Sequence, residues 1–230
     1  MFIAIDGAVK APGTDKCLSV GCALFPEETG NDFYRVICEP SQSTSQRGET
    51  NGLLLALQYA VDKAVYGDDV LILTDSEYLF KTIEQDWCRK WRDADWISGT
   101  GEPPKNQDLW AKIVVLLDTL DAKGIEYSML WTKGHIFNYP ASKINQAMKS
   151  DATGAQLYSN ISTLLNVANC LDRAVERFNE ARLKHDFPKL PTTLAQEYII
   201  ANATVDAIAV YCANILKAHR DALASDDINN

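Results

Sequence analysis

The chain has 230 residues, of which 47% are hydrophobic and 23% are charged, and its formal net charge is −9. This composition is ordinary for a globular protein with one large domain, or with one domain and an appendage. The acidic balance argues against a nonspecific nucleic-acid binder, because neutralising phosphates needs clustered Lys and Arg. It still permits an enzyme that grips phosphates locally or through metal ions.

Neither a membrane span nor a signal sequence is visible, because no apolar run approaches ~18 residues and the N-terminus lacks a basic region. The six cysteines are scattered and form no CxxC pair. We expect them to be reduced packing residues rather than disulfides or zinc ligands. These features predict a cytoplasmic protein without a membrane partner.

The first part of the chain alternates strands with helices. Short apolar runs at 1–9, 17–26 and 32–40, separated by Gly, Pro and Asn, predict a three-strand meander. The further expected elements are a helix at 49–67, a buried strand at 68–76, helices at 76–87 and 106–124, and a fifth strand at 125–135. The sequence therefore predicts an α/β domain over residues 1–155, with a mixed five-stranded sheet flanked by helices.

From residue 157 onward apolar residues recur at alternating steps of four and three. The rhythm runs from Leu157 to Phe178 and, after a break with two prolines at 184–193, from Leu194 to Ile215. It predicts two helices in a C-terminal antiparallel hairpin over 156–230, either an ordinary amphipathic pair or a coiled coil.

The second of these helices carries an additional apolar stripe that includes Ile200 and Val210. That stripe needs a second surface, either the first domain or another chain. A homodimer or a replication-protein partner bound through 157–223 is therefore one expectation for the hairpin, and bracing of the first domain is another.

Three acidic residues occupy unusual positions at strand ends and on an apolar helix face. Asp6 follows an apolar strand, Asp75 ends another, and Glu49 shares a helix face with Leu53 and Ala60. Taken singly, they read as a turn residue, a helix cap and a first-turn acid favoured by the helix dipole. If adjacent central strands bring them together, they form a carboxylate cluster, which repels itself unless hard cations such as Mg²⁺ or Mn²⁺ neutralise it.

An ordered set of motifs resembles type 1 ribonuclease H. The set comprises IDG at the N-terminus, the helix at Glu49, VLILTDSEYLFKTIEQDW, PPKNQDLW and WTKGH, and it covers roughly residues 1–155. The resemblance implies an endonuclease that hydrolyses the RNA strand of RNA–DNA hybrids, in primer or R-loop removal, with two Mg²⁺ ions or Mn²⁺ as a substitute. It makes Asp6, Glu49 and Asp75 metal-binding carboxylates.

The same resemblance assigns roles to two residues near the end of the matched region. His135 corresponds to the family's mobile-loop histidine, which is thought to help proton transfer or product departure. The family has a fourth carboxylate on the following helix, and Asp151 is the nearby candidate, since 136–150 contains no acid. Lys133, Lys143 and Lys149 give this stretch a local positive field.

The resemblance also implies contacts to the hybrid, whose shape rather than base sequence is read. Ser45 and Gln46 are expected near the minor groove, with Gly7, Lys105 and Asn106 as further substrate contacts. The segment DWCRKWRDADW resembles the family's handle, in which Trp87, Arg89, Lys90 and Trp91 would meet the DNA strand. Five bases between residues 81 and 110 are offset by six acids. This balance predicts modest, salt-sensitive affinity.

Two other functions fit the residues. A nuclease of the same fold could act on another nucleic acid such as a DNA junction. A catalytically weak domain could instead serve as a scaffold that acts through its helical hairpin.

Overall fold

The computed structural model describes residues 1–15, 17–28, 30–40, 44–134, 159–160, 162–163 and 170–226. The strands are β1 (Phe2–Lys10), β2 (Leu18–Leu24), β3 (Tyr34–Pro40), β4 (Asp69–Thr74) and β5 (Glu126–Trp131). The helices are the short 3-10 turn η1 (Gly30–Phe33), α1 (Ser45–Lys63), α2 (Glu77–Glu84), α3 (Trp87–Asp93), α4 (Gln107–Ala122), α7 (Cys170–Lys184) and α8 (Thr192–Asp226).

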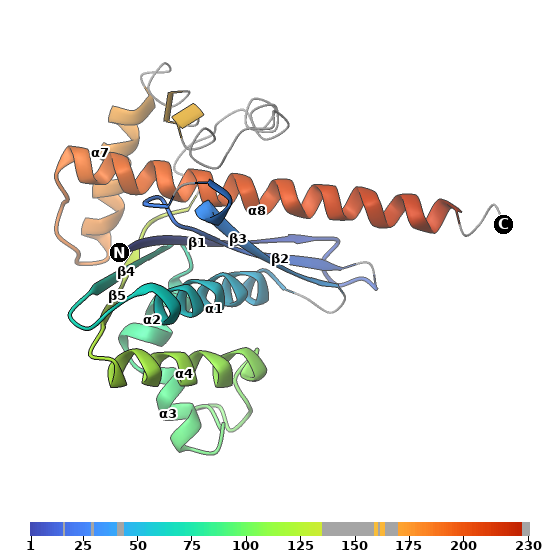
Figure 1. Ribbon diagram of the computed structural model, residues 1–230, viewed down its shortest axis with the longest axis horizontal. Coiled ribbons are helices and arrows are strands. Elements are labelled where there is room, and N and C mark those ends of the chain that lie inside the picture. The colour runs from blue at the N-terminus through green and yellow to red at the C-terminus, as the bar shows by residue number, and fades with distance from the viewer. Residues whose placement is uncertain are drawn as a thin grey trace.

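The five strands form one mixed sheet in the order β3-β2-β1-β4-β5 (Figure 1). The meander β1-β2-β3 is antiparallel, whereas β4 and β5 run parallel to β1. The parallel strands end at the same edge of the sheet as β1, so residues that follow them gather there. The predicted mixed five-stranded sheet is confirmed.

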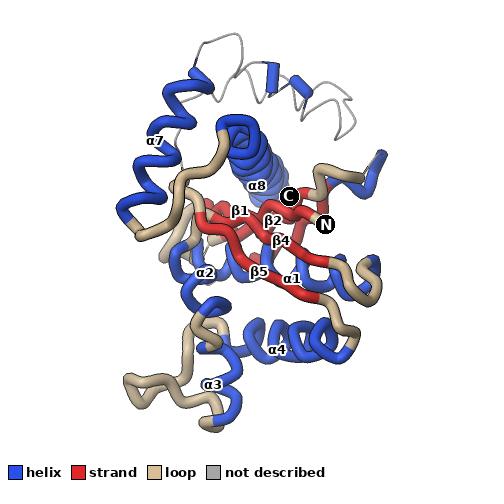
Figure 2. The backbone as a smooth tube through the Cα atoms, turned by 90° about the vertical axis from the view of Figure 1, so that its left-hand side faces the viewer, coloured by secondary structure: helices blue, strands red, loops and turns tan. Residues whose placement is uncertain are grey.

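Helices cover both faces of this sheet (Figure 2). One face carries Ile3 and Ile5 of β1 and packs against α1 and α4. The other face carries Phe2 and Ala4 and packs against α8. Since side chains alternate along a strand, even-numbered residues of β1 point to α8 and odd-numbered ones to α1.

Helix α1 begins earlier than the sequence pattern suggests. The side chain of Thr44 accepts a hydrogen bond from the Arg47 N–H (3.2 Å), which caps a helix that starts at Ser45. Glu49 therefore lies in the second turn rather than at the start of the helix. Likewise, the predicted helix at 76–87 is interrupted, because Asp86 adopts a left-handed conformation (φ 53°) between α2 and α3.

The apolar stripe on the C-terminal helix is explained by α8, which lies along the sheet. Ile200 of this stripe is buried in the same cluster as the strands, and Val210 is partly buried against it. Over Thr192–Ala222 this helix is long and apolar enough to cross a membrane, and 56% of its apolar window is buried against the rest of the protein. The first domain therefore supplies the second surface, and a further partner for 157–223 stays a prediction.

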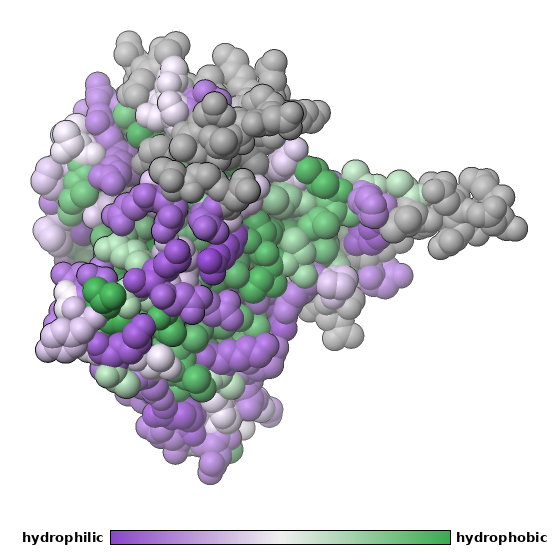
Figure 3. Space-filling model, viewed as in Figure 1, coloured by the Kyte–Doolittle hydropathy of each residue, from purple (hydrophilic) through white to green (hydrophobic). Residues whose placement is uncertain are grey.

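The end of α8 extends beyond the sheet, and hydrophobic surface gathers in the middle of this face, where α8 passes over the strands (Figure 3). Helices α7 and α8 are joined by the short connection that the prolines predict. In both views α7 crosses α8 steeply instead of lying alongside it as an antiparallel hairpin would. The predicted residues 157–169 of the first helix lie largely outside the described part of the chain.

Candidate active site

Two of the predicted carboxylates meet at the centre of the sheet. In the parallel ladder Phe2 pairs with Leu71 and Ala4 with Leu73. Continued by two residues, this register places Asp6 beside Asp75. Asp6 belongs to the even-numbered residues of β1, so its side chain lies on the α8 face, where it is only 6% exposed.

The third carboxylate is brought in by a main-chain contact between α1 and β1. An ideal Cβ on Gly7 would lie 2.3 Å from the Glu49 nitrogen and 2.5 Å from the Gly48 carbonyl carbon. Gly48 in turn lies 3.3 Å, measured from its own ideal Cβ, from the Gly7 Cα. Only glycine at these positions lets the helix approach the strand so closely, and Glu49 is placed beside Asp6 as a result. Gly7, expected as a substrate contact, thus has a structural task here.

Ser76 links Glu49 to the end of β4. Its Oγ donates a hydrogen bond to Glu49 Oε2 (2.5 Å) and accepts one from the Leu79 N–H at the start of α2 (3.4 Å). Burial raises the pKa of Glu49, and the Ser76 hydroxyl opposes that rise. Ser76 belongs to the TDS motif, but only its hydrogen bond to Glu49 in the structure marks it as a residue of the site.

The pKa of Asp6 is strongly perturbed by its surroundings. Burial raises its pKa well above the usual value, and the charges of Asp75, Asp206 and Glu49 raise it further, whereas the Gly7 N–H, 2.6 Å from Oδ1, opposes them. Asp206 comes from α8, whose apolar periodicity gives no sign in the sequence that one of its acids lies near Asp6. The arrangement stores repulsion that a bound cation would relieve.

The side chains around Asp6 are carboxylates, and their oxygen atoms are the ligands that hard divalent cations such as Mg²⁺ prefer. Within the described residues no three His, Cys, Asp or Glu side chains are placed to hold a metal ion. The carboxylates are therefore neighbours, with Glu49 turned to Ser76, rather than a closed ligand shell.

Two predicted site residues, His135 and Asp151, lie outside the described part of the chain, as do Lys143 and Lys149. The chain leading to them is fixed against the site. An ideal Cβ on Gly134 would lie 2.2 Å from Asp75 Oδ2, and the Trp131 Nε1–H donates to the Asp75 carbonyl oxygen (3.2 Å). The roles of His135 and Asp151 stay predictions.

The cations of the predicted handle are engaged within the protein. Arg89 pairs with Asp118 (2.8 Å) and Asp121 (2.5 Å) of α4 and donates to the Tyr127 hydroxyl (3.0 Å). The Lys90 ammonium donates to the Gln85 carbonyl oxygen (2.7 Å). These contacts lower the charge that the handle presents to a nucleic acid.

The handle tryptophans pack against one another. Trp91 lies edge-on to Trp110, with ring centroids 5.8 Å apart, and the Trp87 ring is 6.4 Å from that of Trp91. Trp87 and Trp91 are both half-buried, so each keeps an accessible portion. A role in binding stays a prediction for both.

The remaining predicted contacts surround the start of α1. Ser45 and Lys105 are exposed and Gln46 is half-buried. Arg47 pairs with Glu39 and with Asp108 (2.8 Å), and its guanidinium lies 3.5 Å from the Asn106 side-chain oxygen. Asn106 adopts a left-handed conformation (φ 60°) at the start of α4, where the Leu109 and Trp110 amides bond to its carbonyl oxygen.

Comparisons with known proteins show the family of the chain. Residues 1–151 match the family model of RNase H. Ribonuclease H of Treponema pallidum is 34% identical over 110 residues, which cover 48% of this chain and 60% of that protein. Ribonuclease H of a Cyanothece species is 30% identical over 114 residues, which cover 50% of this chain and 67% of that protein. The chain thus spans less than two thirds of the Treponema protein.

A foamy viral protease-reverse transcriptase in complex with an RNA/DNA hybrid is a structural neighbour, with a TM-score of 0.44 and 18% identity over 56% of this chain and 17% of that chain. The family match covers 151 of 230 residues, and it includes Asp6, Glu49 and Asp75. This chain belongs to the RNase H family.

Proposed function

We propose that the protein is a metal-dependent endoribonuclease that hydrolyses the RNA strand of RNA–DNA hybrids. The observation that carries the proposal is the meeting of Asp6, Glu49 and Asp75, from three separate elements, in a chain of the RNase H family. Removal of replication primers or R-loops is the process that such an activity serves.

RNase H enzymes depend generally on divalent metal ions, and we propose two Mg²⁺ ions here, with Mn²⁺ as a substitute. Asp6, Glu49 and Asp75 would hold them. When bound, such a pair supplies an activated water and stabilises the departing oxygen in phosphodiester displacement. Ser76 orients Glu49 by its hydrogen bond, and the Gly7 N–H orients Asp6.

Substrate contacts are proposed for exposed and half-buried groups around the site. Ser45, Gln46 and Lys105 lie at or near the starts of α1 and α4, which the Arg47 ion pairs join. Because Arg47 and Arg89 are paired within the protein and present less charge to a phosphate backbone, we expect modest hybrid affinity at physiological salt. The phosphate contacts that remain should make this affinity weaken with salt.

The test compares the parent protein with Asp75→Asn on labelled RNA–DNA hybrid, double-stranded RNA and a DNA junction in Mg²⁺. We expect cleavage of the hybrid's RNA strand alone, leaving 5′-phosphate ends, and a rate reduced more than about 10²-fold in Asp75→Asn. Asp62→Asn, which changes an exposed carboxylate on α1, should cleave at the parent rate. Hybrid left intact by the parent, or a preference for the junction, would overturn the proposal.

A further inference from the structure

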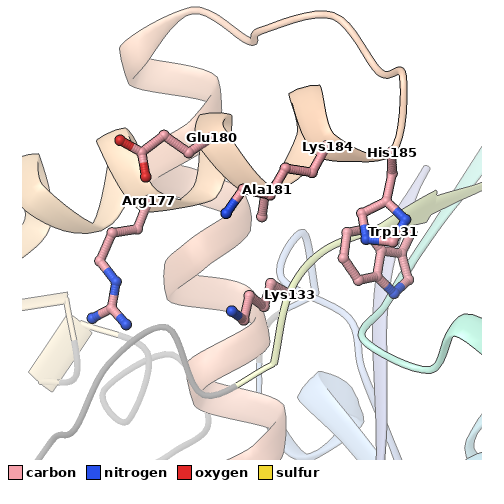
Figure 4. A pocket seen from close by; sticks show the side chains of 7 residues that line it. All are labelled: Trp131, Lys133, Arg177, Glu180, Ala181, Lys184 and His185. Atoms are coloured by element: carbon pink, nitrogen blue, oxygen red, sulfur yellow. The ribbon is translucent and has the colours of Figure 1, made fainter.

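A pocket of about 360 Å³ lies between the end of β5 and α7, outside the carboxylate cluster (Figure 4). One wall comes from the end of β5 and the segment after it, and the other from the end of α7. Its lining residues are Trp131, Lys133, Arg177, Glu180, Ala181, Lys184 and His185. Three of these side chains are permanently cationic and one is anionic, so the pocket is positive in a chain whose net charge is −9.

The two lysines face the same space from opposite walls. Figure 4 shows the Lys133 side chain reaching in from the segment after β5 and the Lys184 side chain reaching across from α7. Among the residues that the structure describes, no ion pair involves either lysine. Arg177 lies at the far side of the pocket, and Glu180 points away from the two ammonium groups in this view.

The pocket adjoins the carboxylates through residues 131–134, two of which line it. Trp131 lines it and also donates to the Asp75 carbonyl oxygen (3.2 Å). Lys133 lines it, and the next residue, Gly134, contacts the Asp75 carboxylate. An anion in this pocket would therefore sit next to the proposed reaction centre.

Helix α7 is held in place by contacts of the connection that follows it. The Asn179 side chain both accepts from the Leu190 N–H (2.8 Å) and donates to the Leu190 carbonyl oxygen (3.2 Å). The Phe187 ring packs edge-on against Phe80 of α2, with centroids 5.4 Å apart. The His185 ring lies 4.4 Å from that of Trp131. These contacts fix Lys184 opposite Lys133.

We propose that this pocket binds a backbone phosphate of the nucleic acid, with Lys133 and Lys184 as its cationic contacts. The inference rests on the proposed function, since it assigns a subsite to the same hybrid. It gives the C-terminal helices a direct role in substrate binding, and it supplies near the site the positive charge that the paired arginines of the handle do not present. Lysine ammonium groups bind phosphate as point charges and release condensed counterions, which makes their contribution salt-dependent.

The test measures the Kd for hybrid over a series of salt concentrations, in an Asp75→Asn background that suppresses cleavage. Lys184→Glu is expected to raise Kd about three- to tenfold and to reduce the slope of log Kd against log salt by about 1. Lys184→Arg should keep the parent Kd. Lys112→Glu makes the same charge change at an exposed position on α4, across the sheet from α8, and should leave both quantities unchanged.

If Lys184→Glu and Lys112→Glu have the same Kd and the same salt slope, the proposal that this pocket binds a phosphate is refuted. Because Lys184 is exposed, the substitution leaves folding intact, and matching thermal melting curves check this. Cleavage by the protein with Asp75 restored tests the proposed function separately. A protein that binds hybrid through Lys184 but never cleaves it would refute the proposed activity and support the phosphate pocket. A protein that cleaves hybrid with no contribution from Lys184 would refute the pocket and support the activity.

Discussion

Gly7→Ala tests whether the main-chain contact between β1 and α1 sets the site. The added Cβ would lie 2.3 Å from the Glu49 nitrogen, whereas ordinary contacts of a Cβ are 3.4–4 Å. Because the obstacle is backbone, no rotamer change relieves it, and α1 must move away by roughly 1 Å. Overpacking of this kind costs about 1–3 kcal/mol, and we expect the upper end.

The same displacement separates Glu49 from Asp6. A misplacement of about 1 Å in a catalytic constellation can lower the rate about 10²-fold. Urea unfolding gives the loss of stability, and hybrid cleavage, measured well below the unfolding midpoint, gives the loss of kcat/KM. Gly99→Ala is the matched control, because an ideal Cβ on Gly99 meets nothing within 4 Å. A Gly7→Ala protein with the stability and the rate of the parent would refute the reasoning.

Three further predictions concern stability. Asp6→Asn should raise the urea midpoint of the metal-free protein at neutral pH, and an unchanged midpoint would contradict this. Burial raises the pKa of Asp6 above its unfolded value, so the free energy of unfolding falls as pH rises from the unfolded pKa through the folded pKa. An uncharged Asn does not titrate and therefore avoids this loss of stability. The Arg47 hydrogen bond lowers the pKa of Asp108, so the ion pair stabilises the fold above the unfolded pKa of Asp108, and this stabilisation is lost as pH falls through the folded pKa. Because the Asp108 side chain is 57% exposed, the loss should be below about 1 kcal/mol. Urea unfolding between about pH 5 and pH 2 should show this loss in the parent protein and not in Asp108→Asn. Ile208→Ala should cost about 2–5 kcal/mol, because Ile208 is fully buried between α8 and the sheet, whereas Ile215→Ala, at a position 48% exposed, should cost less than about 0.5 kcal/mol in the same assay.

The strands could be predicted because each apolar run is bounded by Gly, Pro or Asn, whereas their order in the sheet comes from the structure. In the sequence, Asp6 and Asp75 stand out because each follows an apolar strand run, and Glu49 because it shares a helix face with apolar residues. Their roles in the site stay predictions. The start of α1 was harder to predict. The Ser- and Thr-rich stretch before Arg47 offers several capping residues, and only the structure shows Thr44 accepting the Arg47 N–H.

Long-range partners explain most of what the sequence analysis missed. Arg89 looks available in a basic-aromatic segment, but Asp118 and Asp121 come from α4, which the chain reaches only after a long loop. Asp206 interrupts an apolar helix and reads as a surface charge until α8 is placed over β1. Apolar periodicity gives the buried face of a helix but not its direction, so it could not show that α7 crosses α8.

The glycine contact between β1 and α1 has a consequence for how this sequence can diverge. The distance between Asp6 and Glu49 is set where Gly7 meets Gly48, main chain against main chain. Core side chains such as Leu53 and Leu57 can then be exchanged for others of similar volume without shifting the two carboxylates. Substitutions are therefore tolerated across the core of α1, while a single methyl group at residue 7 is not.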